Sequence, residues 1–512
     1  MSRFLARCDT ADGGCDTVYP ADLTNCPKCN ASTAIMAIPE SLPWNVYVYD
    51  IETYPNIFTN YIINVETGEE WVFEISDRKN EALEHQKFLR SLMLDRAVMV
   101  GFNNLNFDYP VIHETYTRNF QDPMQIYNQA LGRIKGTDTT IYWENGHLIE
   151  QIDLFKINHY DNKAKVTSLK ALEISMRMKD IRDLPFKPGT ILNDQQKDEL
   201  IKYNRHDVMA TIYFYVRCLE MINFRRELSE KYDINFKNMS DSKIGSEIFT
   251  KKLQDAGIQT HSRITGKREV INTVRKSVEL AECIPDYIQF KRPEFKSILQ
   301  KFKDTTLHGD NVKSLFKDLH ITIDGIEYAY GAGGIHACAS KPMKYESDDL
   351  MIIVDVDVEA YYPSLSIENN YYPMHLGERF PPIFRDIVEE RKRVGKKSVL
   401  GKGLKISANG TYGNMGSKYS VFYDLKCLLS ITLTGQLSLS MLIEDCLELP
   451  ACSVIQANTD GFTVRLPRIQ LPALQQLVTA WEQLTKLKME YAYYSRIWIA
   501  DVNNYIAEDM EL

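Results

Sequence analysis

The second half of the chain is organised around residues 350–365, whose sequence is LMIIVDVDVEAYYPSL. Its apolar start, followed by alternation of valine with acidic residues, predicts a buried β-strand, because successive side chains of a strand point to opposite faces. Asp355, Asp357 and Glu359 would then share one face, where a divalent cation would relieve their mutual repulsion. An edge strand with a solvated acidic face is the alternative interpretation of this stretch.

Two segments further along the chain favour the metal site. The segment SVIQANTDGFTVRL, residues 453–466, predicts two strands with Asp460 at the tip, since Asp-Gly supplies the positive φ angles of short hairpins. The segment KGLKISANGTYG puts Lys405, Asn409 and Tyr412 on one helical face through i, i+4, i+7 spacing. A cation, an amide and an aromatic ring so placed suit a nucleoside triphosphate. Separate core or turn roles explain each segment alone, but not their order and spacing together.

In this order the three segments resemble motifs A, B and C of the family B DNA polymerases, particularly the compact bacteriophage members. Motif A, Asp-x-x-Ser-Leu-Tyr-Pro-Ser, is matched from Asp357 onward with Ala-Tyr in place of Ser-Leu. Motif B, Lys-x-x-x-Asn-Ser-x-Tyr-Gly, is matched from Lys405 onward with glycine replacing serine. Motif C, Asp-Thr-Asp-Ser, is matched by Asn458-Thr-Asp460-Gly, which loses the first carboxylate but keeps the second, the family's metal ligand.

The resemblance implies roles for individual residues of the polymerase half. Asp357 and Asp460 would be catalytic and, together with the backbone carbonyl of Val358, would hold two Mg²⁺ or Mn²⁺ ions. Tyr362 would pack under the sugar and exclude a 2′-hydroxyl. The implied nucleotide-binding residues are Tyr362, Arg391, Arg393, Lys405, Asn409 and Tyr412.

Weaker resemblances imply contacts with primer-template DNA. Gly333 and Gly334 are similar to the family's Tyr-x-Gly-Gly motif, with the tyrosine one residue out of register, and a structural glycine turn is the alternative. Thr432 begins a Thr-x-x-Gly-Gln segment that resembles a Thr-x-x-Gly-Arg primer motif. Tyr505 matches the tyrosine of a Lys-x-Tyr motif, with Asn503 where lysine is usual.

The first half of the chain carries a second set of carboxylates. The segment WNVYVYDIE predicts a strand with Asp50 and Glu52 on one face. A buried strand, AVMVGF, precedes Asp108, which opens a predicted helix, and Asp207 falls in a helix predicted over about 194–218. Four carboxylates from three elements can hold two metal ions about 4 Å apart and activate a water.

This set resembles the Exo I, Exo II and Exo III motifs of the proofreading 3′–5′ exonuclease: Asp-x-Glu, Asn-x-x-Phe-Asp and Tyr-x-x-x-Asp. The resemblance implies that Tyr203 orients the attacking water and that Asn104 and Phe107 contact the primer end. We expect His206 to be an ordinary histidine on the helix surface. The implied metal ligands are Asp50, Glu52, Asp108 and Asp207.

Four cysteines crowd the first thirty residues, and Cys-Pro-Lys-Cys has the spacing of a zinc knuckle. The first pair is spaced more widely, so a structural Zn²⁺ ribbon competes with four unconnected thiols. The remaining cysteines are scattered among apolar residues, as expected of buried thiols in a reducing compartment. The candidate zinc ligands are Cys8, Cys15, Cys26 and Cys29.

Composition is that of a globular protein: 512 residues, 25% charged and 44% hydrophobic, enough for about three domains. The net charge of −9 disfavours nucleic acid as partner, although the run RKRVGKK before motif B is locally basic unless it is only a solvated helix face. We identified no span of about 18 apolar residues and no signal sequence, which predicts a cytoplasmic protein without a membrane partner.

The fold class expected is a multidomain α/β and α+β protein, in which an RNase H-like exonuclease domain precedes a polymerase palm with short helical fingers. The predicted divisions are a zinc ribbon at 1–40, the exonuclease at 41–220, a connecting and N-terminal palm region at 221–345, and the palm at 346–512 with fingers at about 375–415.

The expected function is a DNA-directed DNA polymerase for viral genome replication, with 3′–5′ proofreading and with primer-template DNA and dNTPs as substrates. The short spacing between motifs favours a nucleic-acid primer, because protein-primed relatives carry insertions there. Few residues follow Tyr505, which predicts that no thumb is present. Either a separate chain then supplies a thumb or processivity function, or this chain alone synthesises DNA feebly and distributively. The alternatives are a catalytically silent relative that binds DNA and an exonuclease with a vestigial polymerase half.

Overall fold

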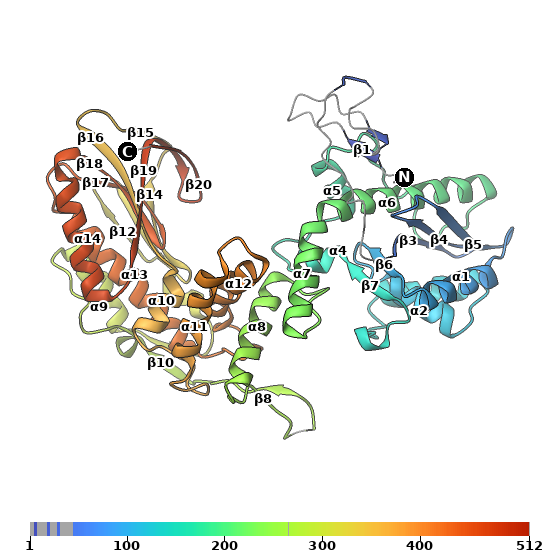
Figure 1. The fold of residues 1–512 in the computed structure, drawn as a ribbon, viewed down its shortest axis with the longest axis horizontal. Coiled ribbons are helices and arrows are strands. Elements are labelled where there is room, and N and C mark those ends of the chain that lie inside the picture. The colour runs from blue at the N-terminus through green and yellow to red at the C-terminus, as the bar shows by residue number, and fades with distance from the viewer. Residues whose placement is uncertain (1–4, 8–17, 21–27, 31–44, 265, 511–512) are drawn as a thin grey trace. The chain divides into compact units, whose positions relative to one another are not determined.

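The computed structural model describes residues 5–7, 18–20, 28–30, 45–264 and 266–510. The chain divides into two compact units, Met1–Asp241 and Ser242–Leu512, because most contacts between residues fall within one unit or the other (Figure 1). Before residue 45, the description is confined to an antiparallel pair, β1 (Leu5–Arg7) and β2 (Val18–Pro20), and a turn. Cys29 is exposed in that turn, while Cys8, Cys15 and Cys26 lie outside the described residues, so the zinc site stays a prediction.

Unit 1 is built on a five-stranded sheet in the order β5-β4-β3-β6-β7. Strands β3, β4 and β5 form an antiparallel meander, whereas β6 and β7 run parallel to the central strand β3. The strands are β3 (Val46–Tyr54), β4 (Ile57–Asn64), β5 (Glu70–Ser76), β6 (Val98–Gly101) and β7 (Glu150–Asp153).

Helices cover both faces of this sheet. One hydrophobic cluster joins one face to α6, and a second cluster joins the other face to α1, α2 and α3. The helices of unit 1 are α1 (Ala82–Leu94), α2 (Asp108–Thr117), α3 (Pro123–Ile134), α4 (Leu154–Ile157), α5 (Leu169–Ser175), α6 (Asp194–Arg217) and α7 (Leu219–Tyr232), with a 3-10 turn at Glu144–Gly146.

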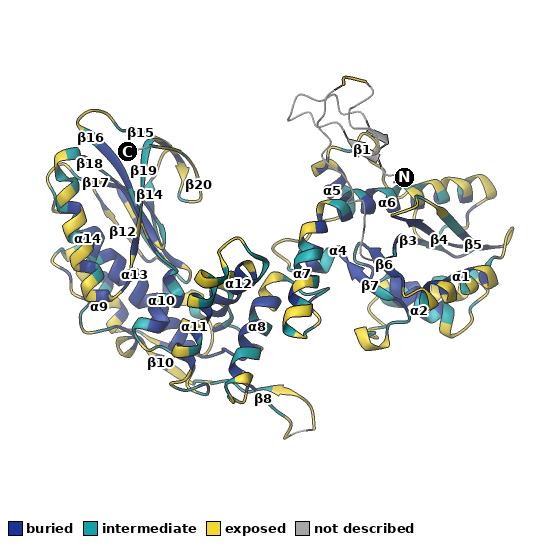
Figure 2. Ribbon diagram, in the orientation of Figure 1, coloured by how far each residue is buried: buried dark blue, intermediate teal, exposed yellow. Residues whose placement is uncertain are grey.

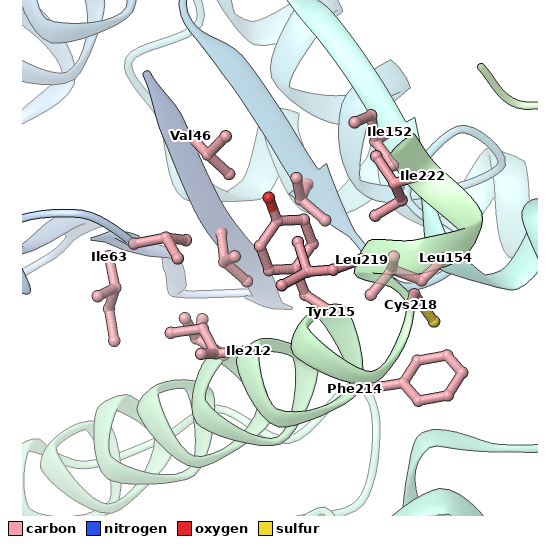
Figure 3. Close-up of a cluster of buried hydrophobic side chains, with 14 of the residues drawn as sticks. Val46, Ile63, Ile152, Leu154, Ile212, Phe214, Tyr215, Cys218, Leu219 and Ile222 are labelled. Carbon is pink, nitrogen blue, oxygen red and sulfur yellow. The ribbon is translucent and has the colours of Figure 1, made fainter. Parts of the chain in front are cut away.

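The alternation of side chains along β3 decides where its acidic residues point. Val46 and Val48 are fully buried in the cluster that contains Tyr215 of α6 (Figure 3). The odd-numbered residues between and after them pack in the cluster on the opposite face. Because the period of a strand is two residues, Asp50 and Glu52 continue the face that looks toward α6.

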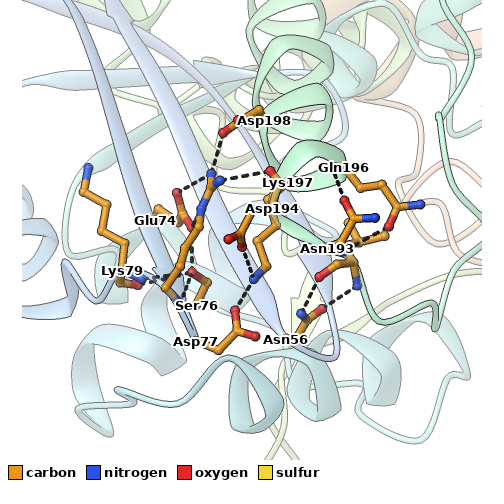
Figure 4. A network of polar contacts seen from close by, with 12 residues as sticks. Asn56, Glu74, Ser76, Asp77, Lys79, Asn193, Asp194, Gln196, Lys197 and Asp198 are labelled. Atoms are coloured by element: carbon orange, nitrogen blue, oxygen red, sulfur yellow. Dashed lines mark hydrogen bonds and ion pairs between the residues drawn. The ribbon is translucent and has the colours of Figure 1, made fainter.

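A polar network fixes the beginning of α6 on the sheet (Figure 4). Asn193 and Gln196 form a capping box, each side chain bonding the other residue's backbone N–H. Lys197 is only 2% exposed because its ammonium lies between Asp77 and Asp194. Since a helix rises about 1.5 Å per residue, anchoring this end also fixes the register of the residues two and three turns further on.

Unit 2 contains a nine-stranded sheet in which every pairing is antiparallel. The order is β12-β13-β14-β17-β18-β16-β19-β15, and β20 pairs with β19. The predicted boundary at 345/346 falls inside β15, so strands from both sides of it share one sheet. The strands are β12 (His320–Ile323), β13 (Ile326–Gly331), β14 (Gly334–Ala339), β15 (Met343–Glu346), β16 (Met351–Val358), β17 (Ser453–Thr459), β18 (Gly461–Pro467), β19 (Met489–Asp501) and β20 (Asn504–Asp509).

The remaining elements complete a mixed α/β protein with fourteen α-helices among the described residues. The later helices are α8 (Asp241–Asp255), α9 (Pro293–Lys303), α10 (Tyr361–Glu368), α11 (Phe380–Val394), α12 (Val399–Asn414), α13 (Leu425–Leu447) and α14 (Leu471–Thr485). The short strands are β8 (His261–Ser262), β9 (Glu269–Val270), β10 (Ser277–Glu279) and β11 (Thr306–His308). The 3-10 turns are η2 (Leu280–Cys283), η3 (Val312–Phe316) and η4 (Arg468–Gln470).

Helix α13 corrects the expectation that no span is long and apolar enough to cross a membrane. By length and composition Leu425–Leu447 passes that test, yet 94% of its most apolar window is buried within the protein (Figure 2). It bonds the sheet through Ser440, whose hydroxyl lies 2.9 Å from that of Tyr330, and it bonds α14 through Trp481, which donates to the Ser438 carbonyl. Its apolar character therefore fits a core helix of unit 2.

Two candidate catalytic sites

Three of the predicted exonuclease ligands converge in unit 1. Each of Asp50, Glu52 and Asp207 offers a carboxylate oxygen, and these atoms lie within 4.8 Å of one another. The first two come from β3 and the third from α6, and all three side chains are half-buried. Asp108 begins α2, is only 6% exposed, and accepts a hydrogen bond of 3.3 Å from the backbone N–H of Ile51.

Burial and mutual repulsion disfavour negative charge on this cluster. Burial, and then the neighbouring carboxylates, raise the pKa of both Asp50 and Glu52 well above the usual range. Burial also raises the pKa of Asp108 and of Asp207 to about 7. Carboxylates crowded in a low dielectric are stabilised by divalent cations, which prefer oxygen ligands. The donor set therefore fits Mg²⁺ or Mn²⁺.

Tyr203 lies one helical turn before Asp207 and hydrogen-bonds its carboxylate, as the i, i+4 spacing predicts. Burial and the neighbouring carboxylates raise the pKa of this phenol, so it stays protonated and can donate. The tyrosine therefore adds a neutral donor to an acidic site.

Asn204 belongs to the same site, although the sequence analysis did not assign it. Its amide donates a 2.7 Å hydrogen bond to Asp50 and accepts one of 3.2 Å from the hydroxyl of Thr59. The side chain is fully buried. The sequence could have indicated its burial, because Asn204 lies four residues after Leu200 and four before Val208 and so shares their buried helix face.

The structure separates the two residues predicted to grip the primer end. Asn104 is fully buried, and its amide donates to the hydroxyl of Tyr49 at 3.3 Å and to Gln151 at 3.0 Å. The side chain is therefore held inside unit 1, and its contact with the primer end stays a prediction. Phe107 is half-buried against the core, which leaves part of the ring accessible.

The expectation of a surface role for His206 is also corrected. Its side chain is only 9% exposed, and its Nε2 lies 3.1 Å from Oε2 of Glu173, a residue of α5. Glu173, His206 and Asp207 form a second group of ligand atoms within 4.8 Å of one another. The helix face that carries this histidine is therefore covered by α5.

In unit 2 the predicted acidic strand is β16, and its end differs from the prediction. Asp355 and Asp357 share a face, but the strand ends at Val358, so Glu359 leaves the alternation. The Glu359 carboxylate instead pairs with Lys392 of α11 at 2.9 Å. The acidic face of the strand therefore has two members rather than three.

The hairpin that presents Asp460 is confirmed as β17 and β18, with Asp460 alone between them. The left-handed residue of the turn is Thr459, with φ of 63°, rather than either member of the Asp-Gly pair, which corrects the predicted turn chemistry. The backbone N–H of Val358 donates to the carbonyl of Asp460 at 2.9 Å. This bond ties the end of β16 to the hairpin tip.

The carboxylates of these elements influence one another. Burial and, after it, the carboxylates of Asp355 and Asp460 together raise the pKa of Asp357 to about 7. Asp355, which the strand pattern places beside Asp357, contacts the Asp357 carboxyl and accepts hydrogen bonds from the hydroxyls of Thr463 and Tyr494. Among the described residues, two groups of three converging ligands are found, and both contain Asp207 of unit 1. No such group includes Asp355, Asp357 or Asp460.

Two tyrosines from the predicted nucleotide-binding set lie face to face. The rings of Tyr362 and Tyr412 stack with centroids 3.8 Å apart and planes 7° from parallel. Tyr362 donates its hydroxyl to the carbonyl of Gly333, and Tyr412 donates to that of Ala332 at 3.1 Å. The glycine-rich turn between β13 and β14 thus meets the aromatic pair through its backbone.

Steric crowding explains why the residue at the end of this turn is a glycine. Gly334 has φ of +141°, and a Cβ there would lie 3.0 Å from the Cα of Thr459. A side chain would therefore collide with the β17–β18 hairpin. The structural interpretation of the glycine turn accounts for this residue, and a DNA contact by Gly333 remains a proposal.

Thr432 and its neighbour Gln436 lie inside the protein. Thr432 is 2% exposed and its hydroxyl lies 2.6 Å from that of Tyr412. Gln436 is 1% exposed, donates to the carbonyl of Gly331 at 2.9 Å and accepts from its N–H at 3.2 Å. Both side chains are therefore held inside unit 2, and the primer contact of Thr432 stays a prediction.

The other predicted contacts lie nearer the surface. Lys405 and Asn409 are exposed on α12, and Arg393 is exposed on α11. Arg391 is half-buried, and its Nε has no hydrogen-bond partner among the described residues. Tyr505 is 45% exposed. Burial raises the pKa of Tyr505, as do the carboxylates of Asp355, Asp357 and Asp460, which places its hydroxyl in their field.

Comparison with known proteins gives a partial match. The chain is 27% identical over 150 residues to a DNA polymerase of Thermococcus gorgonarius, an alignment that covers 22% of this chain and 19% of that protein. It is 26% identical over 150 residues to a DNA polymerase of Thermococcus sp. (strain 9oN-7), with the same shares covered. The match thus spans about a fifth of the length of these relatives. No family model matches the chain.

Proposed function

We propose that this chain is a template-directed DNA polymerase of family B, in the compact form that resembles bacteriophage members, with a 3′–5′ exonuclease. The observation that supports the proposal most is how the carboxylates of the motifs lie: in unit 1, Asp50, Glu52 and Asp207 offer oxygens within 4.8 Å of one another. In unit 2, Asp460 lies near enough to Asp357 to raise its pKa. The similarity to two DNA polymerases supports it. The order β5-β4-β3-β6-β7 supports an RNase H-like exonuclease fold.

In the exonuclease the chain's own residues orient the reaction. Divalent cations held by the carboxylates of Asp50, Glu52, Asp108 and Asp207 would activate a water for attack on the terminal phosphodiester. Tyr203 is protonated and bonded to Asp207, and its hydroxyl would orient that water. Asn204 holds the Asp50 carboxylate through a buried hydrogen bond.

In the polymerase, Asp357, Asp460 and the carbonyl of Val358 would hold the cations that activate the primer hydroxyl and stabilise the leaving pyrophosphate. Lys405, helped by Arg391 or Arg393, neutralises the triphosphate. The remaining side chains position the nucleotide: the stacked Tyr362 and Tyr412 form a flat wall beside the sugar, and Asn409 lies on the same helix as Lys405.

The proposed partners are primer-template DNA and dNTPs. Phe107, Tyr505 and the glycine turn at Gly333 are the accessible members of the predicted DNA contacts. Because the net charge is −9, we expect duplex binding to depend on local cations and to weaken with salt.

The test is an assay of the purified chain on a labelled primer-template with Mg²⁺. With all four dNTPs we expect extension directed by the template, and without dNTPs we expect shortening from the 3′ end. Shortening without any extension would favour the exonuclease-only alternative. Binding without either reaction, by a folded protein, would favour the catalytically silent alternative.

A further inference from the structure

We propose that Glu173, His206 and Asp207 form a third cation site in unit 1, one that takes a transition-metal ion such as Mn²⁺ or Zn²⁺. The site goes beyond the proposed polymerase and exonuclease reactions, because neither uses Glu173 or His206. It adjoins the exonuclease cluster, since Asp207 belongs to both groups of ligands.

The geometry brings three ligand atoms from two helices together. Glu173 projects from α5, whose first turn is capped by Ser168, and His206 and Asp207 are neighbours on α6. All three ligand atoms lie within 4.8 Å of one another, and Nε2 of His206 lies 3.1 Å from Oε2 of Glu173. Adjacent ligands each about 2.1 Å from one ion stand at a similar separation.

Burial of Glu173 and His206 favours a positive charge beside the Glu173 carboxylate. The Glu173 side chain is 2% exposed and the His206 side chain 9%. A carboxylate removed from water requires a counter-charge or a full set of hydrogen bonds. Within the part of the chain that the structure describes, the side chain of Glu173 bonds the imidazole of His206, and that ring also adjoins a second carboxylate, Asp207. A divalent cation would neutralise both carboxylates at once.

The ligand types indicate which cation fits. A set of one imidazole and two carboxylates suits Mn²⁺, Fe²⁺ or Zn²⁺, whereas Mg²⁺ is bound by oxygen ligands and water. The exonuclease cluster, made of carboxylates alone, provides the oxygen set in the same unit. The imidazole nitrogen therefore distinguishes the two positions spectroscopically as well as chemically.

The experiment is pulsed electron paramagnetic resonance of the full chain loaded with Mn²⁺. We expect coupling from a directly bound ¹⁴N nucleus in the wild type and its loss in His206→Gln. The double variant Asp50→Ala, Glu52→Ala should keep the coupling, because it removes only the carboxylate position. His159→Gln is the matched control, since His159 pairs with Asp161 at 3.1 Å but is 36% exposed.

Three further outcomes keep the test decisive. Glu173→Gln should lower Mn²⁺ affinity of the nitrogen-coupled site by about tenfold or more while the thermal transition stays cooperative. A wild-type protein saturated with Mn²⁺ that gives no ¹⁴N coupling would overturn the proposal in favour of a direct Glu173–His206 hydrogen bond. Coupling that persists in His206→Gln would assign the nitrogen to another histidine. None of these readouts depends on polymerase or exonuclease activity.

Discussion

Gly461 lies directly opposite Asp357 in the β16–β18 pair, so close that a Cβ on the glycine would stand 1.6 Å from Oδ1 of the aspartate. The same Cβ would stand 2.6 Å from the carbonyl oxygen of Val356. Gly461 itself has no positive φ angle. The glycine is therefore required by the carboxylate that lies against it, and not by the turn.

This relationship predicts the effect of Gly461→Ala. The new methyl group must displace the Asp357 carboxylate, and a displacement of about 1 Å at a reacting centre can cost about a hundredfold in rate. We expect primer extension to fall by that order, while 3′–5′ shortening is unchanged. Steady-state extension and degradation assays on the same preparation measure both.

Gly132→Ala is the matched control for that substitution. Gly132 lies in α3, and the nearest side-chain atom to its new Cβ would be 3.5 Å away. Alanine in a helix interior is favoured over glycine by about 1 kcal/mol, so this variant should extend primers normally. If Gly461→Ala also extends primers normally, Asp357 is not positioned as we describe.

Tyr362 gives a prediction about sugar choice. Its ring lies against Tyr412, whereas Tyr361 is only 5% exposed, which places Tyr361 in the core. We expect Tyr362→Val to raise ribonucleotide incorporation relative to deoxyribonucleotide incorporation, and Tyr362→Phe to keep the discrimination. Competition between the two nucleotide types in single-nucleotide extension measures the ratio. Unchanged discrimination in the valine variant would remove Tyr362 from the sugar contact.

Stability should depend on pH in an unusual direction when divalent cations are chelated. The pKa values of Asp108, Asp207 and Asp357 are raised to about 7, so the folded chain keeps protons that the unfolded chain releases. The free energy of unfolding should therefore fall as pH rises from about 4 to about 7. Thermal melting in chelator across this range measures the change.

Two controls accompany the pH series. Added Mg²⁺ should restore stability above neutral pH, because a cation takes the place of the lost protons. Asp207→Asn should flatten part of the dependence, since it removes one of the raised carboxyls. A melting temperature that rises steadily with pH in chelator would contradict the electrostatic description of both sites.

Much of each site was predictable because its residues lie on regular elements. The period of β3 places Asp50 and Glu52 together, and the spacing along α6 places Tyr203 beside Asp207. A single element carries each pair, so its geometry alone decides the outcome. The hairpin that carries Asp460 was predictable for the same reason.

The contacts that sequence reasoning missed join elements far apart in the chain. The side chain that covers His206 is Glu173, from a different helix, so helical periodicity alone could not reveal its burial. Likewise, Thr432 is buried because α13 is covered on nearly every side. A motif match does not report exposure, so the burial of Thr432 could not be predicted from the motif.

The N-terminal cysteines give a prediction that stands on the sequence. If Cys8, Cys15, Cys26 and Cys29 form a thiolate site, elemental analysis should find about one Zn²⁺ per chain in protein purified under reducing conditions. Because thiolates dominate such a site, replacing Cys26 and Cys29 by serine should release the metal. Protein that contains no zinc before substitution would favour four unconnected thiols.

The most direct test of the account separates the two carboxylate sites. Asp460→Asn should abolish template-directed extension, by about a thousandfold or more if the residue holds a catalytic cation, and should leave 3′–5′ shortening intact. Asp50→Ala with Glu52→Ala should abolish shortening and leave extension intact. Loss of both activities from either change, in protein that melts like the wild type, would contradict the assignment of one reaction to each unit.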